Sequence, residues 1–159
     1  MRIEGRTFIV TGGGNGIGRE VVLGLLARGA SVAALDLREE GLAETTRLAG
    51  TAAASRLTTY AVNVTDRARV AEVIDEVAAS GLDGLLNVAG IIQPFVKVAD
   101  LSFEDMERVM DVNFWGVVNT TKAALPHLVT RPEACLVNVS SMGGFCPVPG
   151  QSVYGASKA

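Results

Sequence analysis

The stretch Thr11-Gly12-Gly13-Gly14-Asn15-Gly16-Ile17-Gly18 follows a short apolar run and leads into a segment with helical spacing of apolar residues. In this strand-to-helix context, a glycine-rich turn is typical of a dinucleotide site. Gly12 permits a tight turn, Gly16 lets backbone approach a pyrophosphate, and Gly18 lets the helix pack on the sheet. The helix N-terminus then faces the anion. Taken alone, the run could also be an ordinary turn, since 18 of the 159 residues are glycine.

Asp36 strengthens the dinucleotide interpretation. It lies 18 residues after Gly18, at the end of the second predicted strand, where a carboxylate can accept both ribose hydroxyls. The same carboxylate repels a 2′-phosphate, and neither Asn15 nor Leu37 supplies a compensating cation. We therefore expect NAD to be preferred over NADP. Arg38 is the one residue that could still reach a phosphate.

Working outward, short apolar runs alternate with longer segments of helical periodicity. The runs predict strands at residues 7–10, 31–35, 57–62, 84–87 and 135–139, and the longer segments predict helices at 18–28, 39–48, 67–79 and 103–128. Such alternation predicts an α/β fold, a Rossmann-type doubly wound parallel sheet with helices on both faces. Because the strands are nearly continuous apolar runs, we expect none to be half exposed. The region 1–159 is predicted to be a single domain.

Composition excludes several classes of protein. With 48% hydrophobic and 19% charged residues, the chain can bury one sizeable core. It has no apolar run long enough for a membrane span and no apolar leader, so we expect a soluble cytoplasmic protein. The net charge of −3 and interspersed charges argue against nucleic acid as a partner. No residue spacing suggests a metal site, and Cys135 and Cys146 are interpreted as buried free thiols.

Tyr154 and Lys158 are four residues apart, a spacing that brings both side chains to one face of a helix. A tyrosine needs its phenolate stabilised to act as a general acid or base near neutral pH, and a neighbouring cation can do this. By itself the pair is also compatible with two solvated surface side chains.

Taken together, the motifs resemble the classical short-chain dehydrogenase/reductase family. The matching elements occur in the family's order: TGxxxGxG at 11–18, Asn87-Val88-Ala89-Gly90, Asn113, Ser141 and YxxxK at 154–158. The resemblance implies an oxidoreductase that transfers a hydride between a nicotinamide and a secondary alcohol or ketone. It assigns the catalytic roles to Asn113, Ser141, Tyr154 and Lys158.

Each of these roles comes from the resemblance. Tyr154 matches the general acid/base, and Lys158 matches the residue that lowers the tyrosine pKa and holds the nicotinamide ribose. Ser141 matches the hydroxyl that orients the substrate carbonyl, and the family's spacing of thirteen residues to the tyrosine selects it over Ser140. Asn113 matches the residue that supports a water relay to the lysine, although an amide bonded within its own helix is the alternative.

The resemblance also implies a set of cofactor contacts. Small residues in Asn87–Gly90 leave room for the riboses, and Asn63-Val64 stands where the family more often has Asp-Val beside the adenine. An amide oxygen can still accept a hydrogen bond from the adenine amine. The predicted cofactor-binding residues are Gly12, Gly14, Asn15, Gly16, Ile17, Gly18, Asp36, Asn63, Val64, Asn87, Ala89, Gly90, Tyr154 and Lys158.

The segment 142–153 is predicted to line the substrate pocket beside Ser141. Its members nearest the reacting carbon are expected to be Met142, Gly143, Val148 and Gln151, with Gln151 as the one amide contact. Most of these residues are apolar, which favours a hydrophobic substrate such as a steroid, lipid or cyclic compound.

The sequence stops five residues past Tyr154, whereas related enzymes continue this helix and add further strands. One hypothesis is a dehydrogenase whose sequence is incomplete, and whose full-length form is a homodimer or homotetramer with Phe114 and Trp115 near an interface. The other is a short, inactive product that binds a dinucleotide or partner chains. In both cases we expect the fifth strand to form an apolar sheet edge.

Overall fold

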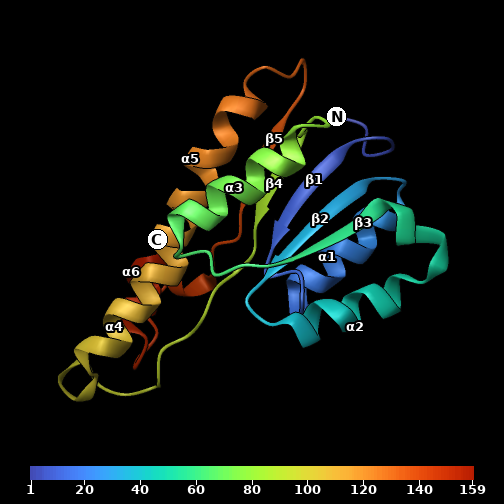
Figure 1. Cartoon of the computed structure of the whole chain (residues 1–159). Helices are drawn as coiled ribbons and strands as arrows, with labels where there is room; N and C mark the ends of the chain where they lie inside the picture. The colour runs from blue at the N-terminus through green and yellow to red at the C-terminus, as the bar shows by residue number, and fades with distance from the viewer.

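A computed structural model describes residues 1–159 and shows strands and helices in alternation (Figure 1). The strands are β1 (Thr7–Thr11), β2 (Ser31–Asp36), β3 (Leu57–Ala61), β4 (Gly84–Asn87) and β5 (Cys135–Asn138). The helices are α1 (Gly16–Ala27), α2 (Glu39–Ala49), α3 (Arg67–Ala78), α4 (Phe103–Met110), α5 (Gly116–Leu128) and α6 (Ser152–Lys158). The predicted α/β class is confirmed.

All five strands form one parallel sheet in the order β3-β2-β1-β4-β5. From β1 the chain first builds outward through β2 and β3, then returns to place β4 on the other side of β1. This reversal leaves a crevice at the carboxyl ends of β1 and β4, where ligands bind in doubly wound folds. The fold therefore directs attention to the segments that follow these two strands.

Two apolar cores lie on opposite faces of the sheet, because neighbouring residues of a strand point to opposite sides. Phe8 and Val10 of β1 pack with Val22 of α1 on the face that carries α1 and α2 (Figure 1). Ile9 packs with Ile74 of α3 on the other face, which α3 and α5 cover. This arrangement explains why the central strands are apolar at consecutive positions.

The outer strands depart from the prediction that no strand is half exposed. Leu136 and Val137 of β5 are 41% and 43% exposed, and Thr58 and Thr59 of β3 also face solvent. Both strands lie at sheet edges, where the helices of this chain cover them incompletely. The expectation of an apolar edge at β5 agrees with this exposure.

The predicted helix 103–128 is not one regular α-helix. Between α4 and α5, residues Asp111–Trp115 form a π-helical turn. A π turn contains one extra residue per turn and is often found at functional sites. Here it contains Asn113, whose side chain is buried. The helical periodicity of the sequence extends through the turn, so the pattern alone does not reveal it.

Polar caps begin several of the helices. Asn15 precedes α1, Asp66 precedes α3 and Ser102 precedes α4, and each accepts a hydrogen bond from a first-turn backbone N–H. Gly50, with φ of 72°, follows α2 and turns the chain away from it. None of the helices combines the length and apolar character needed to cross a membrane.

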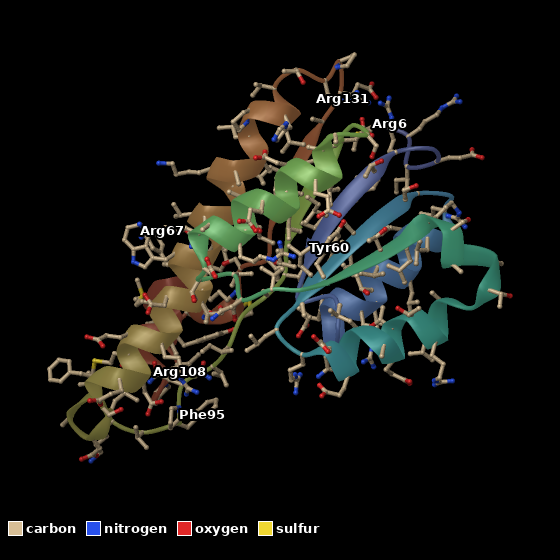
Figure 2. All side chains as sticks on the ribbon, viewed as in Figure 1. Arg6, Tyr60, Arg67, Phe95, Arg108 and Arg131 are labelled. Atoms are coloured by element: carbon tan, nitrogen blue, oxygen red, sulfur yellow. The ribbon has the colours of Figure 1, made fainter.

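A buried ion cluster fastens the amino ends of the central strands. The Asp83 side chain, 4% exposed, pairs with Arg6 at 3.1 Å and with Arg131 at 2.8 Å. Its second oxygen accepts the Thr7 N–H at 3.0 Å. The two arginines lie close to each other in Figure 2. Burial acts to raise the pKa of Asp83, but the Thr7 hydrogen bond and the guanidinium groups outweigh it, so the pKa lies below its ordinary value.

We predict that Asp83→Asn lowers the free energy of unfolding at neutral pH by about 3 kcal/mol, because it leaves two arginines facing a neutral group. A depressed pKa stabilises the fold above the unfolded value of about 3.9 and loses this contribution as the pH falls through the folded value. Urea unfolding from neutral to acid pH measures both effects. The exposed Asp75→Asn is the control and should change the unfolding free energy by less than about 1 kcal/mol. Equal effects of the two variants would contradict the prediction.

Candidate active site

The glycine-rich turn after β1 is built so that backbone atoms form its surface. Gly12 has φ of 71°, and a Cβ there would lie 2.9 Å from Cα of Ala89. A Cβ on Gly18 would collide with the carbonyl oxygen of Gly12. The turn can therefore keep α1 and the β4 segment this close only without side chains. Asn15 caps α1 by accepting the Gly16 N–H at 2.8 Å.

Asp36 is held in place at the end of β2. Its carboxylate accepts the N–H of Gly14 at 3.0 Å and the N–H of Arg38 at 3.0 Å. A Cβ on Gly14 would approach the carboxyl carbon of Asp36 to 2.8 Å. The glycine turn and the carboxylate thus fix each other. Gly14 acts here as a support for Asp36, since it does not line the adjoining cavity.

A cavity of about 580 Å³ lies at the carboxyl ends of the strands. Its volume is within the range of cofactor sites. At one side the first turn of α1 offers backbone N–H groups suited to an anion, and Asp36 offers a fixed acceptor. The residues therefore fit a dinucleotide. The lining consists of Gly12, Asn15, Gly16, Ile17, Gly18, Asp36, Leu37, Arg38, Val62, Asn63, Val64, Val88, Ala89, Gly90, Ile91 and Val112.

Asn87 is predicted from the sequence to contact the cofactor, but it does not line this cavity. Its side chain is 3% exposed and is bonded to Asn138 at 2.9 Å and Thr120 at 2.7 Å. Its hydrogen bonds therefore connect β4 to β5 and to α5. Thr11, the first residue of the TGxxxGxG motif, has no role predicted from the sequence; its hydroxyl accepts the N–H groups of Val88 and Ala89 at 3.1 Å each.

Lys158 connects α6 to the edge of the cavity. Its ammonium donates to the carbonyl oxygen of Val139 at 3.0 Å, and burial lowers its pKa. A Cβ on Gly90 would lie 3.1 Å from this ammonium and 3.2 Å from Oδ1 of Asn113. Gly90 also lines the cavity, so Lys158 and Asn113 adjoin the end of the cavity away from Asp36.

Tyr154 and Ser141 lie beside the same short loop. The Ser141 hydroxyl accepts the Gly143 N–H at 3.2 Å, and a Cβ on Gly143 would lie 3.5 Å from the Tyr154 ring. Tyr154 is half-buried. The neighbouring Ser140 hydroxyl donates to the carbonyl oxygen of Lys158. Ser140 is therefore used to hold the end of α6, and Ser141 is the serine on the side of the Tyr154 ring.

Asn113 uses its whole carboxamide to join three parts of the site. Its oxygen accepts the Ile91 N–H at 2.8 Å, and its nitrogen donates to the Ile91 carbonyl at 2.9 Å and to the Ser157 hydroxyl at 2.9 Å. The alternative of an amide bonded only within its own helix is wrong. Asn113 instead links the π turn to the β4 segment and to α6.

The predicted substrate residues belong to the loop between β5 and α6. Met142 is 71% exposed, whereas Gln151 is buried. The carboxamide oxygen of Gln151 would lie 3.6 Å from a Cβ on Gly143. Gly143 and Gln151 line a second cavity of about 690 Å³, together with Val148 and the Val96–Val98 segment. Met142, Ser141 and Tyr154 do not line this second cavity, and Gly143 is the residue that adjoins both the cavity and the Tyr154 ring.

Gln93 is a further buried polar residue that the sequence analysis does not identify. It is 1% exposed and bonds to the backbone at the beginning of α6. Its position between the apolar Ile92 and Pro94 is the only sign of burial in the sequence. Thr11 gives a similarly weak sign, because a threonine at the end of an apolar strand is common.

The cysteines and the histidine lie outside the candidate site. The prediction of two buried thiols is wrong for Cys146, which is exposed in the loop, and Cys135 is half-buried. His127 lies in the last turn of α5, and its Nε2 is 2.7 Å from Oδ1 of the exposed Asp75. No group of three or more His, Cys, Asp or Glu side chains has the arrangement of a metal site.

A sequence-family model described as short chain dehydrogenase matches residues 6–159. The protein SadH of Mycobacterium tuberculosis is 41% identical over 157 residues, which are 98% of this chain and 56% of SadH. The 3-oxoacyl-[acyl-carrier-protein] reductase FabG of Thermotoga maritima is 36% identical over 161 residues, covering all of this chain and 65% of FabG. The chain thus spans between about half and two thirds of the length of these relatives.

Solved structures of short-chain dehydrogenases are also similar to this chain over nearly its whole length. Carveol dehydrogenase from Mycobacterium avium, in complex with NAD, superposes with a TM-score of 0.92 at 27% sequence identity. The match covers 99% of this chain and 62% of that protein. The similarity therefore extends over every element described above.

Proposed function

Because the chain belongs to the short-chain dehydrogenase family, whose members bind NAD or NADP, we propose that it forms the cofactor-binding and catalytic domain of an NAD-dependent oxidoreductase. The reaction is hydride transfer between the nicotinamide and a secondary alcohol or ketone. The observation that carries the proposal is the contact at Gly90, where Lys158 and Asn113 adjoin the same cavity that Asp36 lines. This arrangement combines a cofactor site with proton-transfer groups.

The residues of α6 and its neighbouring loop would handle the substrate hydroxyl. Tyr154 transfers the proton, and the Ser141 hydroxyl orients the substrate oxygen. Lys158 supplies the nearby cation, and burial lowers its pKa, so the ammonium releases a proton more readily than an exposed lysine does. Asn113 holds the Ile91 backbone and Ser157, and we assign it the support of a proton relay to Lys158. When bound, the nicotinamide supplies the hydride acceptor or donor.

Asp36 supports the preference for NAD. Its carboxylate is held in place by two backbone N–H groups, so a 2′-phosphate would have to approach a fixed acidic side chain. Arg19 in α1 is already used: it donates to Thr45 at 3.1 Å and to the Gly14 carbonyl. Arg38 is exposed and lines the cavity, so its guanidinium is the one cation that could still meet a phosphate there, while its backbone N–H supports Asp36. We propose that the fixed carboxylate of Asp36 outweighs Arg38 and makes the site prefer a free ribose over a phosphorylated one.

We predict that Asp36→Asn weakens NADH binding by about tenfold and lowers the preference for NADH over NADPH by at least about tenfold, since it removes a charge-assisted acceptor and the repulsion together. Titration of the wild-type chain with both nucleotides, followed by nicotinamide fluorescence, tests the proposal itself. The matched control is Asp66→Asn, which alters only the cap of α3. A wild-type chain that binds NADPH more tightly would contradict the assignment of Asp36.

The substrate is proposed to be a hydrophobic secondary alcohol or ketone. Met142 and Phe145 of the loop beside Ser141 are 71% and 80% exposed, so an apolar compound would cover surface that now faces water. A role in nucleotide binding without turnover remains the second hypothesis, and it is separated from the first by measuring NADH binding and alcohol oxidation independently. The homo-oligomeric state and cytoplasmic location expected from the sequence stay predictions.

A further inference from the structure

Gln93 lies in the segment between β4 and α4, just beyond Gly90, and is 1% exposed. Its carboxamide oxygen accepts the N–H of Val153 at 2.9 Å and the N–H of Tyr154 at 2.8 Å. Its nitrogen donates to the carbonyl oxygen of Gly150 at 3.0 Å. Two donors face the oxygen and one acceptor faces the nitrogen, so only this orientation of the amide satisfies all three groups.

The beginning of α6 depends on an acceptor from elsewhere in the chain. The residue before the helix, Gln151, makes no side-chain bond to the first turn. Val153 and Tyr154 occupy the second and third positions of α6, whose N–H groups are the ones that a capping side chain normally satisfies. Gln93 therefore caps α6 from a distance of about sixty residues in sequence.

The same segment also holds the other end of α6. Asn113 binds both backbone groups of Ile91 and donates to Ser157, in the last turn of the helix. In the loop before α6, Gly150 has φ of 79°. A Cβ on Gly150 would lie 3.2 Å from the backbone carbonyl carbon of Phe95. Phe95 is labelled in Figure 2 on the segment that leads from β4 to α4. Segment 91–95 thus meets α6 and its preceding loop at three points: through Asn113 at Ile91, directly at Gln93, and at the backbone of Phe95.

We infer that Gln93 is a positioning residue: it sets the location of Tyr154 and Lys158 relative to the nicotinamide end of the cavity. The inference rests on the proposed function. Gln93 lines neither the cofactor cavity nor the cavity beside the loop, so it acts only through α6. The adenosine end at Asp36 has no contact with it. Its loss is therefore expected to weaken binding at one end of the cavity and spare the other.

Two substitutions in the full chain test this inference. Gln93→Met keeps a similar length but removes the donor and the acceptor, whereas Gln93→Glu keeps an acceptor for Val153 and Tyr154. With Gln93→Met we expect NADH affinity to fall about tenfold, which is roughly 1.4 kcal/mol of binding free energy. ADP affinity should change less than about twofold. Amide hydrogen exchange at Val153 and Tyr154 should accelerate at least about tenfold with Gln93→Met and return close to the wild-type rate with Gln93→Glu.

Asp83→Asn is the control for general destabilisation, because it weakens the fold at the opposite ends of the strands without touching α6. It should leave the ratio of NADH to ADP affinity unchanged. The inference is overturned if Gln93→Met keeps both this ratio and the slow amide exchange, or if it lowers both affinities equally. If the wild-type chain binds ADP but not NADH, the proposed function fails. Amide exchange in the two Gln93 variants then decides separately whether Gln93 holds α6.

Discussion

Replacement of Tyr154 by phenylalanine is expected to lower kcat for alcohol oxidation by at least about 1000-fold, while NADH affinity changes less than about threefold. General acid/base groups contribute rate factors of about 100 to 10,000, and the substituted side chain would retain the ring but lose the hydroxyl assigned to exchange the proton with the substrate. The ring packs beside Gly143, so the substitution preserves the contacts of the loop. The measurement is NADH formation with a secondary alcohol that the wild-type protein oxidises.

The chain offers a matched control, since its only other tyrosine is Tyr60. The Tyr60 hydroxyl bonds to Glu76 at 2.9 Å on the β3 side of the sheet (labelled in Figure 2). Tyr60→Phe is expected to leave kcat within about twofold of the wild-type value. If the Tyr154 variant keeps its turnover, or if both variants lose it equally, the assigned role of Tyr154 is wrong.

Gly18→Ala is expected to weaken NADH binding by at least about 100-fold. A Cβ at this position would overlap the Gly12 carbonyl oxygen, which belongs to the backbone and cannot rotate away as a side chain can. Relief requires α1 to move from the turn, which displaces the N–H groups that face the cavity. Such overpacking also lowers the free energy of unfolding by about 1–3 kcal/mol. Nucleotide titration and urea unfolding measure the two effects.

Gly24 provides the comparison within the same helix. A Cβ there would meet only the end of the Arg28 side chain, at 3.3 Å, and this flexible group can shift. Because alanine favours helix over glycine by about 1 kcal/mol, Gly24→Ala is expected to stabilise the chain and leave NADH affinity unchanged. A Gly18→Ala variant that behaves like Gly24→Ala would show that the close packing at Gly12 is not required for binding.

Features that depend on neighbouring residues could be predicted from the sequence. The strand positions differ from the observed ones by one residue at most, because each buried strand is a short apolar run between turns. Gly12, Gly16 and Asp36 are also identifiable as cavity residues. Their role follows from a tight strand-to-helix turn and a carboxylate at the end of the next strand, both of which are local in sequence.

Features that depend on contacts between distant segments could not be predicted. Nothing near Gln93 in the sequence indicates that it caps a helix about sixty residues away. The π turn at Asn113 keeps the apolar spacing of the flanking helices, so periodicity does not distinguish it. Likewise, Asn87 ends β4 beside the cavity residues Val88 and Ala89, but its own side chain is buried and bonded to Asn138 and Thr120. These interactions arise only when the sheet and α6 come together.

The two cores differ in how much of the chain must be made before they can form. The buried residues of the core on the α1 and α2 face lie between Phe8 and Ala53, with Leu86, Val88 and Cys135 packed against its margin, whereas the buried residues of the opposite core extend from Ile9 to Leu128. Contacts between closer residues carry a smaller loop-closure entropy. During synthesis, the buried part of the first core can therefore begin to form while β4 and α5 have not yet left the ribosome. The opposite core can form only after β4, α3 and α5 have been made.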